Sequence, residues 1–143
     1  MCIRDSDEVD LTVEMLKRIV PAYDAPLVQY RGLGLFRNIQ DPRVLWIGLD
    51  VDPVLRKLKA ELDKELRILG FRVERRDFRP HLTLARLKWL QNTEALANLL
   101  HAYRDYYFQE STIPKLIYYE SILGSDGPRY KVINSFRFKY ASP

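Results

Sequence analysis

The stretch Arg-Pro-His-Leu-Thr-Leu-Ala-Arg at residues 79–86 alternates polar and apolar side chains, which predicts a β-strand over residues 79–87. Because successive side chains of a strand point to opposite faces, we expect His81, Thr83 and Ala85 to share one face. Residues two apart lie about 6.6 Å from each other along a strand, close to the span of a phosphate group. An imidazole suits proton transfer near neutral pH, and a hydroxyl can donate to a phosphate oxygen. His81 and Thr83 therefore predict a phosphate-handling pair, with open space beside them at Ala85.

The spacing of this pair also has a purely structural explanation. A half-buried strand with a polar outer face shows the same alternation. Under both explanations we expect Leu82 and Leu84 to point into the core. The choice between the two explanations depends on the rest of the chain.

Hydrophobic periodicity and turn residues divide the remainder into helices and strands. Leucines at helical spacing, after a start at Asp52-Pro53 and before Gly70, predict a core helix. The residues GSDGP at 124–128 predict the turn of a closing hairpin. We expect helices also at residues 7–20 and 93–103, and strands at residues 26–36 (with Gly32 and Gly34 as bends or bulges), 44–49, 115–122 and 130–138. Since helices and strands do not alternate regularly, the expected fold class is α+β.

The composition is that of a globular protein, with 143 residues, 47% apolar and 29% charged. No apolar run approaches the roughly 18 residues that span a bilayer, so a membrane protein is not expected. Cys2 is the only cysteine, which rules out an internal disulfide and favours a reducing, cytoplasmic setting. The sequence also has no Cys/His spacing typical of a metal site. The net charge of +4 and the pI of about 9.2 suit an anionic partner such as RNA, although an ordinary basic surface has the same balance.

Four segments of the sequence resemble one family. The stretch at residues 79–86, which follows the leucine-rich helix and a segment at residues 71–78, resembles the second signature of LigT-like RNA 2′,3′-cyclic phosphodiesterases, in the two-histidine phosphoesterase superfamily. The segment RVLWIG at residues 43–48 is similar to the family's middle strand. The segments at residues 119–123 and 127–130 are similar to its closing hairpin. The resemblance covers about residues 7–138.

The resemblance implies a two-lobed fold with antiparallel sheets flanked by helices, and one His-x-Thr motif on each side of a cleft. Family members open the 2′,3′-cyclic phosphate at RNA ends to leave a 2′-phosphate, and some join tRNA halves through a 2′-5′ linkage. His81 would then be the proton acceptor that activates water, and Thr83 would hold a phosphate oxygen. The scheme needs no metal and no cofactor. A monomeric hydrolase that binds RNA is the expectation.

One departure from the family pattern concerns the second histidine. His101 is the only other histidine, and Tyr103 rather than threonine follows two residues later. The local pattern is helical and His101 lies off the apolar stripe, so we expect it to be exposed and not catalytic. The first His-x-Thr motif is absent from the sequence.

We interpret this departure as an N-terminal truncation. The missing part would be a strand-helix-strand portion on the order of 30 or more residues. Residues 1–6 are then expected to be a non-native leader, and residues 7–143 a single, incomplete phosphoesterase domain. The 143-residue chain is expected to have little or no phosphodiesterase activity by itself.

Several basic and aromatic residues are candidates for binding substrate. Arg86 recurs in the family motif, but strict alternation would put it opposite His81 unless a bulge redirects it. Tyr130 could stack on a terminal base, although packing on Trp46 or Phe136 would explain it as well.

Other residues of these kinds are given less weight. Trp46 itself is assigned to the core, and the aromatic residues 106–108 to packing at an edge. The arginines before the strand could contact RNA phosphates or form a solvated loop: Arg72, Arg75, Arg76 and Arg79.

Two other functions remain open at this point. One is an RNA- or nucleotide-binding module that kept Thr83 and the basic residues but lost catalysis. The other is a related phosphoesterase that acts on a small cyclic nucleotide or a phosphorylated metabolite.

Overall fold

The computed structural model describes residues 6–74, 77–88, 90–125 and 127–140. The chain forms two compact units. The helical unit comprises residues 1–26, 53–76 and 112–143, and the sheet unit comprises residues 27–52 and 77–111. Arg75, Arg76 and most of the expected leader lie outside the described residues.

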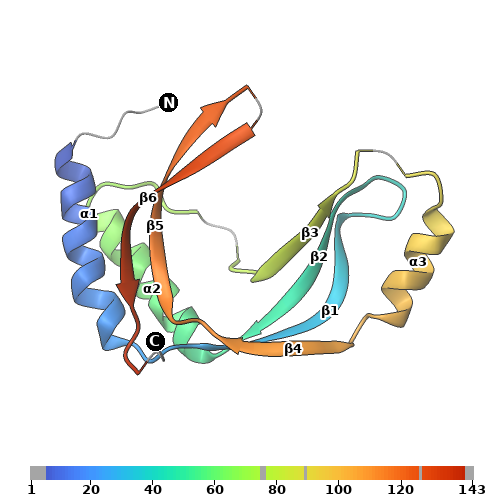
Figure 1. Ribbon diagram of the computed structural model, residues 1–143, viewed down its shortest axis with the longest axis horizontal. Helices are drawn as coiled ribbons and strands as arrows, with labels where there is room; N and C mark the ends of the chain where they lie inside the picture. The colour runs from blue at the N-terminus through green and yellow to red at the C-terminus, as the bar shows by residue number, and fades with distance from the viewer. Residues whose placement is uncertain (1–5, 75–76, 89, 126, 141–143) are drawn as a thin grey trace. The chain divides into compact units, whose positions relative to one another are not determined.

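The sheet unit is built on a four-stranded sheet (Figure 1). Its strands are β1 (Leu27–Arg37), β2 (Pro42–Val51), β3 (His81–Arg86) and β4 (Tyr107–Thr112), in the order β3-β2-β1-β4. The β1–β2 and β2–β3 pairs are antiparallel. The helix α3 (Thr93–Ala102) lies to one side of the strands and begins at Asn92, whose side-chain oxygen accepts from the Ala95 N–H at 2.8 Å. The sheet unit thus places β3 at one edge of its sheet.

A bulge in β1 allows the end of α3 to contact this strand. Gly32 is skipped in the pairing of β1 with β2 and has φ +71°. Its N–H donates to the Tyr106 carbonyl at 2.9 Å, and an added methyl group would lie 2.4 Å from the Arg104 carbonyl oxygen. Only glycine satisfies both the positive φ and the close approach of the backbone. The bulge predicted at Gly32 is confirmed, whereas Gly34 pairs regularly with Trp46.

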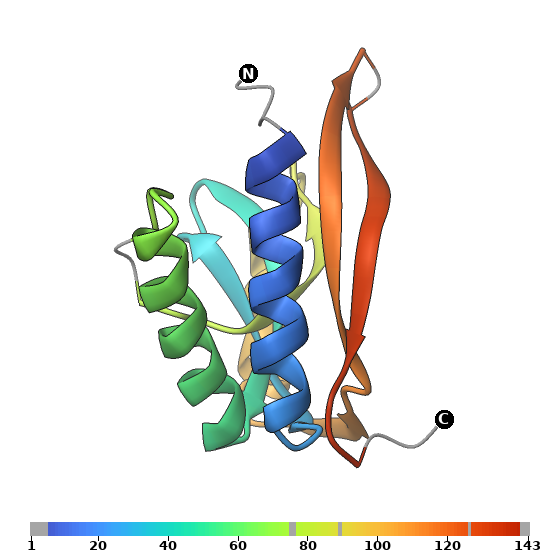
Figure 2. The same cartoon turned by 90° about the vertical axis from the view of Figure 1, so that its left-hand side faces the viewer.

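The helical unit contains α1 (Ser6–Ile19), a short 3-10 turn η1 (Val20–Ala22), α2 (Pro53–Ile68), β5 (Lys115–Gly124) and β6 (Gly127–Arg137). The strands β5 and β6 form a two-stranded antiparallel hairpin, and α1 lies between that hairpin and α2 (Figure 2). Its buried core consists of Met15, Leu16, Ile19, Val20, Leu58, Phe136 and Phe138.

The predicted leucine stripe of α2 is confirmed. Leu58 is fully buried, and four further leucines of the stripe pack against the same core: Leu55, Leu62, Leu66 and Leu69. The helix ends at Gly70 with φ +84°, where the Phe71 N–H donates to the Leu66 carbonyl and the Gly70 N–H to the Arg67 carbonyl. These two bonds form a Schellman cap, which explains why glycine stands at this position.

The α+β class and the two-lobed architecture are confirmed, and the predicted helices and strands are present with ends shifted by a few residues. One element was not predicted. Residues 107–112 form β4, which pairs with β1 and is tied to it by a side-chain bond from Gln29 to Glu110 at 3.3 Å. Within the described ranges, none of the helices is both long and apolar enough to cross a membrane.

We expect the Tyr23→Phe variant to change how the stability of the helical unit depends on pH. The Tyr23 hydroxyl donates to the Glu61 carboxylate, and this bond, with burial, raises the pKa of Tyr23 above its usual value. A raised folded-state pKa gives stability that is present below pH of about 10 and is lost as the pH rises further. Denaturant unfolding at neutral pH should show a loss of about 1 kcal/mol in the variant.

Between neutral pH and pH of about 11, the wild type should lose more stability than Tyr23→Phe. The Tyr30→Phe variant removes a hydroxyl bonded to Ser111 in the sheet unit and serves as the control. Identical pH profiles for wild type and Tyr23→Phe would contradict the assigned role of the bond.

Candidate active site

The pairing of β3 with β2 determines which side chains share a face. His81 pairs with Gly48, Thr83 pairs with Trp46, and Arg86 pairs with Val44. Directly opposed residues of an antiparallel pair project from the same face of a sheet. The three partners on β2 are spaced two residues apart and therefore share one face. His81, Thr83 and Arg86 thus lie on one face, which we call the His81 face.

A bulge at Leu84 produces this arrangement. The register shifts between Leu45 and Trp46 of β2, so that Leu84 has no partner and Ala85 pairs with Leu45. Arg86 is therefore turned onto the His81 face, which strict alternation would not allow. Ala85 lies on the opposite face, so the prediction that it shares a face with His81 was wrong.

The prediction that Leu82 and Leu84 point into the core was also wrong. Their side chains are 46% and 48% exposed. The physical reason lies in the sheet order, because β3 is an edge strand and Leu84 is the unpaired bulge residue. Neither leucine is covered as a residue of a central strand would be.

The ring of His81 is held by a backbone bond. Its Nδ1 lies 2.8 Å from the Arg79 carbonyl oxygen. A carbonyl can only accept, so Nδ1 donates its hydrogen to it, and in the neutral form of such a ring Nε2 carries the lone pair. The side chain is exposed, and Nε2 is thus available to take a proton from water or substrate.

Two aromatic side chains form a wall beside His81. The ring centroid of Phe36 lies 4.7 Å from that of His81 at 90°, and the Trp46 ring lies 6.5 Å from His81 at 62°. Phe36 and Trp46 also contact each other at 5.6 Å. The assignment of Trp46 to the core was therefore wrong, because it is only partly buried and stands next to the candidate base.

Gly34 leaves room for this wall. A methyl group added at Gly34 would lie 2.1 Å from Cζ2 of Trp46, so the indole lies flat against the glycine. The indole N–H is buried and has no partner among the described residues. The position of the indole thus follows from ring packing on Gly34 rather than from a hydrogen bond.

The remaining predicted residues occupy different places. The Arg79 side chain is exposed, and its carbonyl holds His81. Tyr130 belongs to the helical unit, pairs with Ser121 on β5 and is 66% exposed, with the Tyr119 ring 6.1 Å away. It therefore packs on Tyr119 instead of on Phe136. His101 is exposed on α3, as predicted.

Charged and polar residues continue the His81 face on β1 and β2. Arg31 pairs with Gly48, and its Nε lies 4.0 Å from Oδ2 of Asp50. The pKa of Tyr107 is raised, mainly because of desolvation and secondly because of the nearby Glu110 carboxylate. The Arg31 guanidinium partly lowers this pKa again. Sequence reasoning missed Arg31 and Phe36, because only the sheet register brings them to this face.

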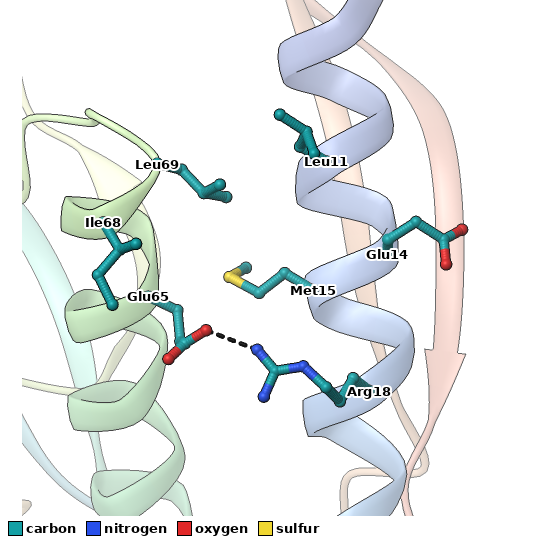
Figure 3. A pocket seen from close by; sticks show the side chains of 7 residues that line it. All are labelled: Leu11, Glu14, Met15, Arg18, Glu65, Ile68 and Leu69. Atoms are coloured by element: carbon teal, nitrogen blue, oxygen red, sulfur yellow. Dashed lines mark hydrogen bonds and ion pairs between the residues drawn. The ribbon is translucent and has the colours of Figure 1, made fainter.

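A pocket lies elsewhere, between α1 and α2 of the helical unit (Figure 3). Its apolar walls are crossed by a 2.6 Å ion pair between Arg18 and Glu65. It is lined by Leu11, Glu14, Met15, Arg18, Glu65, Ile68 and Leu69. None of the predicted site residues takes part in it.

Comparison with known proteins identifies the family. The model of the family described as LigT like Phosphoesterase matches residues 47–130, which include His81, Thr83 and Arg86. The chain belongs to this family.

Curated relatives agree with the assignment, and a solved structure shares the fold. The chain is 36% identical over 107 residues to the RNA 2′,3′-cyclic phosphodiesterase of Aeropyrum pernix, covering 74% of this chain and 61% of the relative. It is 31% identical over 128 residues to the protein of the same name in Methanocaldococcus jannaschii, covering 90% and 67%. The crystal structure of TT0787 of Thermus thermophilus shares the fold, with a TM-score of 0.68 and 24% identity over 94% of this chain and 72% of that one. The LigT-like chain thus spans about three fifths of the length of the first of these relatives.

We expect Gly34→Ala to displace the Trp46 indole. The added methyl group cannot coexist with a ring carbon at 2.1 Å, and overpacking of this kind typically costs about 1–3 kcal/mol. In a Trp89→Phe background, which leaves Trp46 as the only tryptophan, the emission maximum should shift to longer wavelength and the denaturation midpoint should fall. Gly124→Ala is the matched control, because its methyl group would lie 3.4 Å from the Gly127 carbonyl oxygen, an ordinary contact. Unchanged emission in Gly34→Ala would show that the indole does not lie on Gly34.

Proposed function

We propose that this chain supplies the proton-accepting half of an RNA 2′,3′-cyclic phosphodiesterase site, a hydrolase that opens cyclic phosphate ends to 2′-phosphates. The observation that carries the proposal is the orientation of His81, whose Nδ1 is bonded to the Arg79 carbonyl and whose Nε2 is left to accept a proton. Thr83 shares its face by alternation, and the bulge at Leu84 brings Arg86 onto the same face. The names of the curated relatives support the same activity.

The chemistry assigned to the His81 face follows from these groups. Nε2 of His81 takes a proton from water, and the resulting hydroxide attacks phosphorus. The Thr83 hydroxyl and the Arg86 guanidinium bind non-bridging oxygens, on which charge accumulates. The bond from phosphorus to the 3′-oxygen breaks, and that oxygen must receive a proton from a general acid. The scheme uses no metal and no cofactor.

The general acid has no candidate among the histidines of this sequence. His101 is the only histidine besides His81, and it lies exposed on α3 without a following threonine at the motif spacing. The 143-residue chain therefore holds one of the two histidines that the reaction needs.

Other residues are assigned to binding the RNA. The exposed Arg79 side chain is assigned to contact backbone phosphates without reading sequence. Tyr130 is exposed beside Tyr119 and offers a ring on which a terminal base can stack. The proposal further includes tRNA halves as substrates, the reverse 2′-5′ ligation and a monomeric state, which rest on the family resemblance. It also includes a cytoplasmic location, which rests on the single cysteine.

A chain that has His81 but no general acid should behave differently toward two kinds of substrate. RNA with a 2′,3′-cyclic phosphate end needs a proton on its leaving oxygen, so the 143-residue chain should open it little or not at all. A nucleoside 2′-(p-nitrophenyl phosphate) releases p-nitrophenolate without a proton, so His81 alone should suffice. Release of p-nitrophenolate should fall by about 100-fold or more in His81→Ala.

The His101→Ala variant is the matched control and should keep the wild-type rate. Equal rates for wild type and His81→Ala would remove His81 from the mechanism and favour a binding module. Robust opening of the cyclic phosphate end by the unmodified chain would show that the site is not half a site. Preference for a cyclic mononucleotide over a short RNA in competition would favour the small-molecule phosphoesterase.

A further inference from the structure

Arg31 lies in the same row of the sheet as the candidate base. It pairs with Gly48 on β2, and Gly48 pairs with His81 on β3. The three residues therefore form one line across β1, β2 and β3, with their side-chain positions on the same face. Asp50 is two residues after Gly48 on β2 and therefore lies on the same face. The contact of Arg31 with Asp50 thus places the arginine on that face independently of the pairing.

The middle residue of this row, Gly48, has no side chain, and the Trp46 indole lies beside it. Neighbouring strands lie about 4.8 Å apart, so the Cα atoms of Arg31 and His81 are separated by roughly 10 Å. Across this separation the long arginine side chain and the imidazole can reach the same phosphate group. Only glycine fits at this position, because a methyl group there would lie 2.6 Å from the Arg31 carbonyl oxygen and 3.6 Å from the Trp46 ring.

The present partner of Arg31 holds it weakly. Its Nε lies 4.0 Å from the Asp50 carboxylate, and the two side chains are 49% and 70% exposed. Exposed ion pairs at such distances contribute little to stability. A phosphate with up to two negative charges is a stronger partner, since a guanidinium can form two parallel bonds to it.

Arg31 and Arg86 both lie on the His81 face, in different directions from His81. Arg86 lies beyond Thr83 on β3, and Arg31 lies across Gly48 from His81. We infer that Arg31 is a substrate-binding residue, which leaves Asp50 and binds the terminal phosphate of the RNA from a different direction than Arg86. The inference rests on the proposed function, since it names a further ligand of the same phosphate.

The test compares two short single-stranded RNAs that differ only in a terminal 2′-phosphate or 2′-hydroxyl. The quantity measured is the ratio of their dissociation constants for the full 143-residue chain, obtained by titration at fixed salt. The wild-type ratio should favour the phosphorylated RNA. In Arg31→Ala that preference should fall roughly tenfold, and Arg31→Lys should recover part of it, because a lysine keeps the charge but not the paired bonds.

The Arg18→Ala variant is the matched control, because it removes an arginine from another exposed ion pair and should leave the ratio unchanged. The salt dependence gives a second readout that a structural role would not change. Loss of one phosphate contact should lower the slope of log affinity against log salt by about 0.7 for single-stranded RNA. The thermal melting of Arg31→Ala should match that of the wild type.

The outcomes separate this inference from the proposed function. A ratio that falls in His81→Ala and Thr83→Val but not in Arg31→Ala would overturn the role of Arg31 and leave the phosphate site intact. A wild-type chain that binds both RNAs equally would overturn the proposed site itself.

Discussion

The antiparallel pairing of β3 with β2 is the constraint on which the candidate site depends. It is closed at both ends by backbone bonds, from the Leu49 N–H to the Pro80 carbonyl at 3.2 Å and from the Leu87 N–H to the Arg43 carbonyl at 2.8 Å. The extra residue of β3, Leu84, lies between these fixed ends and cannot slip out of the strand. The side on which Arg86 projects is thereby determined by the number of residues in β3, as well as by their identity.

How far the sequence predicts this fold depends on whether the decisive information is local. The leucine stripe of α2, its glycine cap and the turn at residues 124–128 are local patterns, and each was predicted. The strand β4 was not, because residues 107–112 owe their extended form to pairing with β1 rather than to their own alternation. A short edge strand of this kind has little signal in sequence.

The candidate site also has features that could be predicted from the sequence and features that could not. His81 and Thr83 could be predicted from spacing and from the family resemblance, and both lie on one face. The positions of Ala85 and Trp46 could not be predicted correctly, because they depend on register and on the space above Gly34. Gly34 and Gly48 on this face are required because neighbouring atoms leave no room for a side chain, not because of their backbone angles. A single sequence does not reveal such close contacts.

The hairpin that carries Tyr130 is anchored unevenly. At its base Leu116 pairs with Phe136, and both contact the core of the helical unit. Toward the tip, Tyr119, Leu123 and Tyr130 are 44%, 72% and 66% exposed, on a sheet of two strands within the described chain. Local opening should therefore become easier from base to tip, and amide hydrogens should exchange with solvent faster in that direction. A base stacked on Tyr130 would oppose this opening, so RNA binding would slow amide exchange at the tip of the hairpin, far along the chain from the histidine strand.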